Sequence, residues 1–183
     1  MADLETKRLV LEPIEPRHAA ALFEPLRDAA IYRFIPRDPP SSVEKLAERY
    51  ARLQAGDPDG KQAWLNFAVR LIEGPVYIGK VQATISADAA DVAYLFSPRH
   101  WGQGYASEAV RALIDHLFAA YAVRVVRASL DTRNERSAAL LERLGFARVG
   151  RADNADHFKG GPSHEFFYET VHEQWDSTVS LKT

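Results

Sequence analysis

The stretch that decides the fold is Tyr94-Leu95-Phe96-Ser97-Pro98-Arg99-His100-Trp101-Gly102-Gln103-Gly104-Tyr105-Ala106-Ser107-Glu108. A strand is expected to run into a loop that carries two glycines two positions apart, and a long helix follows at once. Glycines let the main chain turn tightly, so that successive N–H groups converge on one point. The helix N-terminus adds unpaired donors and the positive end of its dipole. The stretch therefore predicts a cradle for a pyrophosphate, with an ordinary turn as the alternative.

Two other kinds of phosphate-binding loop fit this stretch less well. No Lys-Ser/Thr pair and no acidic ligand for Mg²⁺ follow the glycines, which argues against a nucleotide P-loop. Ser107 stands where the third glycine of a dinucleotide-binding loop is expected. An ATP- or NAD-dependent enzyme is therefore the least favoured reading.

Hydrophobic periodicity places the other elements around this stretch. Helices are expected at 16–30, 41–55, 104–121 and 134–144, with a capping box of Ser41 and Glu44 and with Asn134 as an N-cap. Alternating or β-branched runs predict strands at 6–14, 64–72, 76–86, 92–96, 123–130, 146–150 and 166–171. Strands at both ends around a central strand–helix–strand–helix unit predict a mixed α/β fold.

Length, charge and cysteine content restrict the class of protein. The chain has 183 residues, 23 Lys+Arg, 25 Asp+Glu and no Cys. One domain over residues 1–183 is expected, and the near-neutral charge argues against nucleic-acid or anionic-membrane partners. Absence of cysteine excludes disulfides, thiolate metal sites and a Cys nucleophile. No signal peptide and no apolar run of about 20 residues is recognisable, which predicts a cytoplasmic protein, and the six histidines show no metal-binding spacing.

A family resemblance becomes specific at the glycines. Arg99-x-x-Gly102-x-Gly104 resembles the Arg/Gln-x-x-Gly-x-Gly/Ala signature of the GCN5-related N-acetyltransferases (GNAT), and the run 101–110 resembles the subgroup that acetylates ribosomal-protein N-termini. Asn134-Glu135-Arg136-Ser137 and Leu144-Gly145-Phe146 sit where that family has its Asn helix and its Leu-Gly-Phe strand start. The start of the chain at 6–11 and the loop at 32–36 also resemble that subgroup, so the resemblance covers nearly the whole chain.

The resemblance implies a fold and a reaction. The fold would be a single α+β domain with a mixed, mostly antiparallel sheet flanked by helices on both faces. The reaction would move an acetyl group from acetyl-CoA directly to an amine, and the absence of Cys independently excludes an acyl-cysteine intermediate. The residues implied to hold acetyl-CoA are Leu95, Phe96, Ser97, Arg99, Gly102, Gln103, Gly104, Tyr105, Ala106, Ser107 and Asn134. Main-chain N–H groups of Leu95-Phe96-Ser97 would also bind the oxyanion.

The implied proton-transfer groups include a position where this chain departs from the family pattern. The family's tyrosine near the sulfur is replaced by Leu141, and the subgroup's serine corresponds to Ser137, one helical turn after Asn134. Without the resemblance, these two would be an N-cap and a solvated helix residue. The subgroup's carboxylate base corresponds to Asp156, with His157, Glu165 or a chain of waters as alternatives.

The sequence does not distinguish between two classes of acceptor, a protein N-terminus and a small amine. By the resemblance, the segments 31–40 and 159–164 lie over the acceptor site. Residues 97–151 carry nine Arg and five acids, +4, which leaves −6 for the rest of the chain. This suits a polyanionic cofactor in that segment and predicts an acidic acceptor surface for a cationic amine. The competing hypothesis is a catalytically degenerate acyl-CoA sensor or interaction module, and a homodimer is left open.

Overall fold

The fold is built on one mixed sheet of eight strands. The computed structural model describes residues 1–179, and its sheet has the order β1-β2-β3-β4-β5-β6-β8-β7. Every neighbouring pair is antiparallel except β5 and β6, which are parallel. The strands are β1 (Leu4–Glu5), β2 (Leu9–Pro13), β3 (Ala63–Leu71), β4 (Tyr77–Ser86), β5 (Ala89–Phe96), β6 (Val125–Asp131), β7 (Ala147–Phe158) and β8 (Gly161–Val171).

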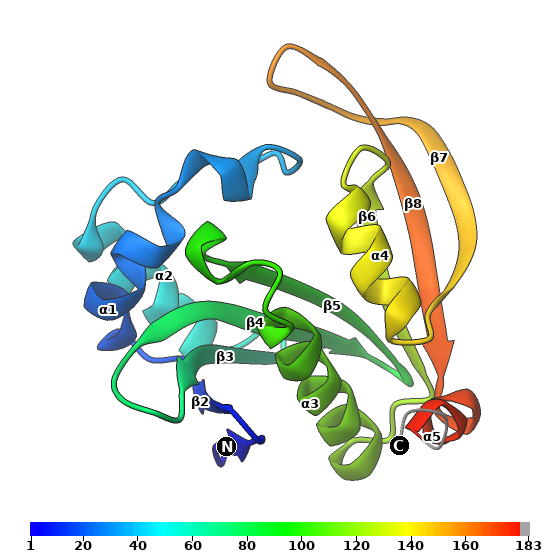
Figure 1. Cartoon of the computed structure of the whole chain (residues 1–183), viewed down its shortest axis with the longest axis horizontal. Coiled ribbons are helices and arrows are strands. Elements are labelled where there is room, and N and C mark those ends of the chain that lie inside the picture. Colours follow the sequence, from blue (N-terminus) through cyan, green and yellow to red (C-terminus); the bar gives the residue numbers. More distant parts are fainter. Residues whose placement is uncertain (180–183) are drawn as a thin grey trace.

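Helices cover both faces of the sheet, as predicted (Figure 1). On one face lie α1 (His18–Leu26) and α2 (Val43–Ala55), with the short 3₁₀ helix η1 (Ala29–Tyr32) between them. On the other lie α3 (Tyr105–Ala120), α4 (Glu135–Arg143) and α5 (His172–Val179), and η2 (Pro98–His100) precedes α3. The α+β architecture expected from the sequence is therefore confirmed.

The alternation of side chains along the strands creates two apolar cores. Val92 and Phe96 of β5 and Val126 and Leu130 of β6 belong to the larger core, with α3 and α4. Leu95 of β5 points the other way and packs against the smaller core of α1 and α2. The two sides are called the α3 face and the α2 face below.

Most predicted elements are present, and the differences have local causes. Ser42, not Ser41, caps α2: its hydroxyl accepts the Lys45 N–H at 3.2 Å, so the predicted capping box is wrong by one residue. The helix expected over 16–30 ends at Leu26, because Asp28 adopts an extended conformation and caps η1. The short β1 and the C-terminal α5 were not predicted.

The largest difference is the length of the C-terminal hairpin. β7 and β8 together run from Ala147 to Val171, whereas the sequence predicts two short strands. Most side chains of β7 are exposed on both faces, so that the strand has no apolar alternation to reveal it. Figure 1 shows the outer half of this hairpin projecting beyond the sheet.

Among residues 1–179, no helix combines the length and the apolar character that a membrane crossing requires.

Candidate active site

The sheet splits between its two parallel strands. β5 and β6 are paired only where Ala89, Ala90 and Asp91 face Val125, Val126 and Arg127. Beyond this point β5 continues against β4 and β6 continues against β8. Figure 1 shows the two strands diverging, with the loop that follows β5 on one side of the opening and α4 on the other. One edge of β5 is therefore left without a strand partner over its last five residues, and this separation of β5 from β6 is called the gap below.

Strand register decides which main-chain groups of β5 face this gap. The Ser97 N–H is engaged on the opposite side, where it donates to the Ile78 carbonyl at 2.9 Å. Leu95, two residues earlier and paired with Lys80, faces β4 as well. Phe96 faces the gap, and its carbonyl accepts a hydrogen bond from the Trp101 indole at 2.8 Å. Of the three residues expected to donate to an oxyanion, only Phe96 directs its N–H to the gap.

The glycine loop forms the predicted helix start. Gly102 and Gly104 have φ of 74° and 80°, the left-handed conformation that side-chain-bearing residues rarely adopt. The first helical hydrogen bond runs from the Glu108 N–H to the Gly104 carbonyl at 3.0 Å. Among the described residues, the N–H groups of residues 103–107 donate to no acceptor outside α3. All five precede Glu108, whose N–H makes the first helical hydrogen bond. This is the donor arrangement that binds an anion.

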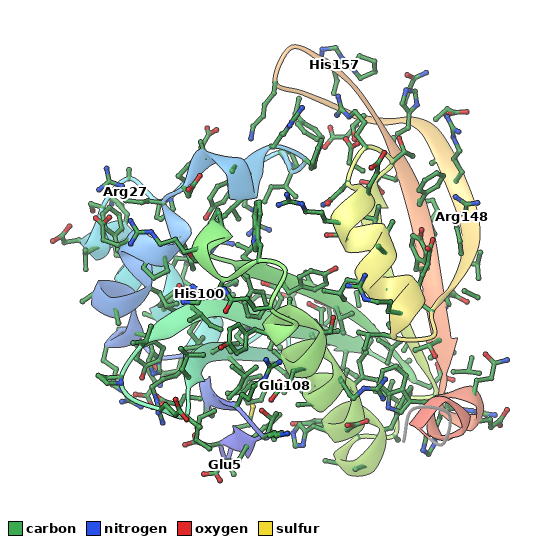
Figure 2. The ribbon with its side chains drawn as sticks, in the orientation of Figure 1. Glu5, Arg27, His100, Glu108, Arg148 and His157 are labelled. Carbon is green, nitrogen blue, oxygen red and sulfur yellow. The ribbon has the colours of Figure 1, made fainter. Side chains whose placement is uncertain are left out.

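The N-terminal segment braces this loop. Arg8 donates from Nε to the Glu108 carboxylate at 2.6 Å and from Nη1 to the Gln103 carbonyl at 3.0 Å. Its guanidinium also lies 4.5 Å from the centre of the Tyr105 ring. Burial alone would raise the pKa of the Glu108 carboxyl, but hydrogen bonds from Thr6 and Arg8 lower it. Glu108 therefore stays ionised with its charge compensated (Figure 2 labels it at the start of α3), and it does not repel a phosphate from the helix end.

Two arginines border the loop in different ways. The Arg99 side chain, a predicted cofactor ligand, is exposed, and its carbonyl accepts a hydrogen bond from Gln103 at 3.1 Å. Arg136 of α4 crosses the opening and lies 4.8 Å from the Trp101 ring centre. Arg136 thus connects the two walls of the gap. The sequence did not predict a role for Arg136, although it lies between Asn134 and Ser137.

The first turn of α4 brings the predicted pair to the α3 face of the gap. The Asn134 side chain caps the helix by accepting the Ser137 N–H at 3.2 Å, which confirms the N-cap prediction. The Ser137 side chain lies against the buried Tyr94 hydroxyl of β5, without a hydrogen bond of good geometry. Burial raises the pKa of Tyr94 to about 12, with Ser137 lowering it in part. Leu141 is buried in the core.

The predicted carboxylates lie on the opposite, α2 face. Asp131 follows the inward-facing Leu130, so it points to the α2 face, and it pairs with Glu165 of β8. The Ser163 hydroxyl donates to Asp131 at 2.8 Å, and Ser163 pairs with Asp156 of β7. Cross-strand partners share a face, so Asp156 and Glu165 also belong to the α2 face.

The carboxylates of Asp131 and Asp156 differ in how many of their oxygens are already hydrogen-bonded. Hydrogen bonds from Arg133 are the main reason that the pKa of Asp131 is lowered to about 2, and its oxygens are committed to Arg133 and Ser163. Asp156 is exposed and accepts the His157 N–H at 2.7 Å. Figure 2 labels His157 at the end of the hairpin. The structure records no contact between Asp156 and Ser137, since the two lie on different faces.

The hairpin reaches the segment that precedes α2. Lys159 donates to the Tyr32 carbonyl and to the Arg37 carbonyl, the latter at 3.3 Å. The Arg133 guanidinium lies 6.0 Å from the ring centre of Phe34 in the same segment. Residues 31–40 and 159–164, both expected at the acceptor site, are therefore brought together across the α2 face of the gap.

Within the part of the chain that the structure describes, no group of three His, Asp or Glu side chains could hold a metal ion.

A strand pair that splits beside a helix N-terminus with unpaired N–H groups suits an extended, phosphate-bearing ligand. Residues 8–147 match the acetyltransferase (GNAT) domain family. The chain therefore belongs to the GNAT acetyltransferases and is an N-acetyltransferase, in a family that uses acetyl-CoA.

Relatives agree with this assignment. The chain is 26% identical over 163 residues to an uncharacterized N-acetyltransferase, p20, of Bacillus licheniformis, with 87% of this chain and 90% of the relative covered. It is 24% identical over 153 residues to the FsC-acetyl coenzyme A-N(2)-transacetylase of Aspergillus fumigatus, with 80% and 65% covered.

Solved structures show the shared fold. RimL, a ribosomal-protein alpha-N-acetyltransferase in complex with coenzyme A, has a TM-score of 0.84 at 18% identity, with 93% of this chain and 98% of that chain covered. A GNAT-family acetyltransferase from Bacillus anthracis has a TM-score of 0.81 at 21% identity, with 94% and 99% covered.

Proposed function

We propose that this protein transfers an acetyl group from acetyl-CoA directly to a primary amine, on a protein N-terminus or a small molecule, with both substrates bound at once. The observation that carries this proposal is the split sheet, because β5 and β6 separate beside the glycine loop and the two faces of the sheet carry different chemistry there. The α3 face presents the glycine loop, Asn134 and Ser137. The α2 face presents carboxylates and the segments 31–40 and 159–164.

The main chain would hold the cofactor. Free N–H groups in the loop that ends at Ser107 suit the pyrophosphate, with Arg99 and Arg136 near it. The free edge of β5, where Phe96 faces the gap between Leu95 and Ser97, suits the extended pantetheine arm, which can pair with a strand that has lost its neighbour. When bound, acetyl-CoA supplies the activated acyl group.

The reaction needs an oxyanion donor and two proton transfers. The amine nitrogen attacks the thioester carbonyl carbon from the α2 face, the C–N bond forms, and the C–S bond breaks. The Phe96 N–H is proposed to stabilise the oxyanion. Ser137, on the α3 face, is proposed to give a proton to the departing thiolate. Asp156 is proposed to receive the ammonium proton directly or through water, and Glu165 shares its face.

Thermal unfolding tests the cofactor first, with acetyl-CoA, CoA, ATP and NAD compared in parallel. A ligand at 100 times its Kd stabilises a protein by about 2.7 kcal/mol. For a chain of this size, this corresponds to a rise in Tm of roughly 5–10 °C. The rise is expected for acetyl-CoA and CoA alone, and thiol release on addition of amines then separates an enzyme from a degenerate sensor. No shift with either CoA ligand at saturation would contradict the cofactor assignment.

Gly104→Ala is expected to weaken CoA binding by about tenfold or more, because a left-handed alanine costs roughly 1–2 kcal/mol and a methyl group there would lie 3.3 Å from Arg8 Nη2. Calorimetric titration with CoA measures this. Gly60→Ala is the matched control, since Gly60 has φ of 65° in an open turn. Both variants should lose similar stability. Equal CoA affinity in the Gly104→Ala and Gly60→Ala variants would show that the Gly104 turn is not part of the CoA-binding site.

A further inference from the structure

Lys80 of β4 is a buried cation without a counter-ion. Its side chain is 3% exposed, and among the described residues its recorded hydrogen bond goes to Gln82 Oε1 at 2.8 Å. No carboxylate of the described chain lies within ion-pair distance of it. A buried ammonium with one neutral acceptor leaves two N–H donors unused and costs several kcal/mol of desolvation. Burial, with Arg37 nearby, lowers the pKa of Lys80 to about 8, which agrees with that penalty.

Lys80 lies one strand away from the gap between β5 and β6. Lys80 is the cross-strand partner of Leu95, so both point to the α2 face, and β5 alone separates Lys80 from the opening. Lys80 lines a cleft of about 280 Å³ between the sheet, α2 and the segment before α2. The Tyr50 side chain lines the same cleft, is 1% exposed, and its hydroxyl has no hydrogen-bond partner in the described chain.

The charge of this cleft is opposite to the one expected for the acceptor surface. Four basic side chains and two acidic ones line it, namely Lys45, Arg49, Arg52 and Lys80 against Asp38 and Glu48. Lys45 and Glu48 are paired with each other at 2.9 Å. This cleft therefore differs in charge from the acidic acceptor surface that the charge balance of the chain predicts.

We propose that the acceptor amine also carries a carboxylate, which enters this cleft and binds the Lys80 ammonium and the Tyr50 hydroxyl. The proposal rests on the proposed acetyl transfer and specifies its substrate class. Strands lie about 4.8 Å apart, so a group held above β4 is roughly 5–10 Å from an amine at the gap. The amino nitrogen and the carboxylate oxygens of an α-amino acid lie about 3 Å apart, so one hydrogen bond of about 2.8 Å extends the reach to about 6 Å, within the lower part of that range.

Matched acceptor pairs test the proposal in the intact protein. Each of a series of α-amino acids is compared with its own α-amide, which keeps the amine and removes the negative charge, and thiol release gives kcat/KM. A charge-assisted hydrogen bond of about 1.5–3 kcal/mol predicts a preference for the acid of roughly 10–100-fold. Lys80→Met should reduce this ratio to about 1, mainly through KM, whereas Lys80→Arg should retain part of it. Lys61→Met, an exposed lysine paired with Asp59, is the control that should keep the full ratio.

A second measurement does not depend on turnover. N-acetyl-α-amino acids, the products of the reaction, should raise the Tm of CoA-bound protein, and their amides should not. The rise should be lost in Lys80→Met, although that variant itself should be as stable as the unsubstituted protein or more so, because a buried cation is removed. Acids and amides used equally, an acid preference that survives in Lys80→Met, or no stabilisation by any N-acetyl acid would each overturn the proposal. Failure of the proposed acetyl transfer can be distinguished from failure of the Lys80 proposal, because in the first case acetyl-CoA itself would not raise the Tm.

Discussion

Glu12→Gln is expected to lower the free energy of unfolding by about 3 kcal/mol and the Tm by roughly 6–12 °C. Glu12 of β2 is 8% exposed and is the centre of a polar cluster under α1. It accepts hydrogen bonds from Arg70 Nε at 2.7 Å and from the Tyr77 hydroxyl at 2.7 Å, and it lies 3.0 Å from His18 Nε2. Glutamine keeps the volume but leaves the half-buried Arg70 without its counter-charge. Chemical denaturation at pH 7 measures the loss.

The same cluster predicts the direction of the pH dependence. Burial alone would raise the pKa of Glu12, but hydrogen bonds from Arg70, Tyr77 and His18 outweigh it and lower the pKa from 4.5 to about 2. A lowered folded-state pKa means that the stabilisation is complete above pH 4.5 and is lost as the pH falls towards 2. The loss of stability over this acid range should be smaller in Glu12→Gln. Asp131, whose pKa is also about 2, should maintain the remainder.

A matched control separates this effect from the removal of any charge. Glu24 pairs with Arg27 on the surface, where its side chain is 73% exposed. Glu24→Gln should change the free energy of unfolding by less than about 0.5 kcal/mol. Similar losses in the two variants would show that the Glu12 cluster contributes no more than a surface ion pair.

Ser137→Ala is expected to lower kcat by about 100-fold or more and to change the affinity for CoA by less than about threefold. The Ser137 N–H remains capped by Asn134 in this variant, so the helix start is preserved. Only the hydroxyl beside Tyr94 on the α3 face is lost. Steady-state thiol release and calorimetric titration with CoA measure the two quantities. Ser86→Ala, an exposed serine at the end of β4, is the control that should change neither.

The pH profile distinguishes proton donation from a packing role. A thiolate needs no proton donor once the pH exceeds the thiol pKa of about 8.5, so the deficit of Ser137→Ala should shrink at high pH. A deficit that is constant with pH would indicate a role in positioning. An unchanged kcat at neutral pH would exclude Ser137, and Tyr94→Phe would then test the neighbouring phenol.

Much of the local structure could be predicted because it depends on residues close in sequence. The left-handed glycines at 102 and 104, the helix that follows them and the Asn134 cap each need only a few neighbouring residues. The long hairpin could not be predicted, because an exposed strand has no apolar period. The predicted cap, Ser41, is one residue from the observed cap, Ser42, because only backbone conformation separates these neighbouring serines.

The sequence by itself determined the family, the glycine loop and the first turn of α4, because covalent geometry and short-range hydrogen bonds decide them. Only the tertiary structure decided which N–H groups of β5 face the gap, since that depends on the pairing of Ser97 with Ile78. It also placed Arg136 against Trp101, and Lys80 in one cleft with Tyr50. These relations join residues 19 to 35 positions apart, and strand register and helix packing, which no local pattern encodes, bring them together.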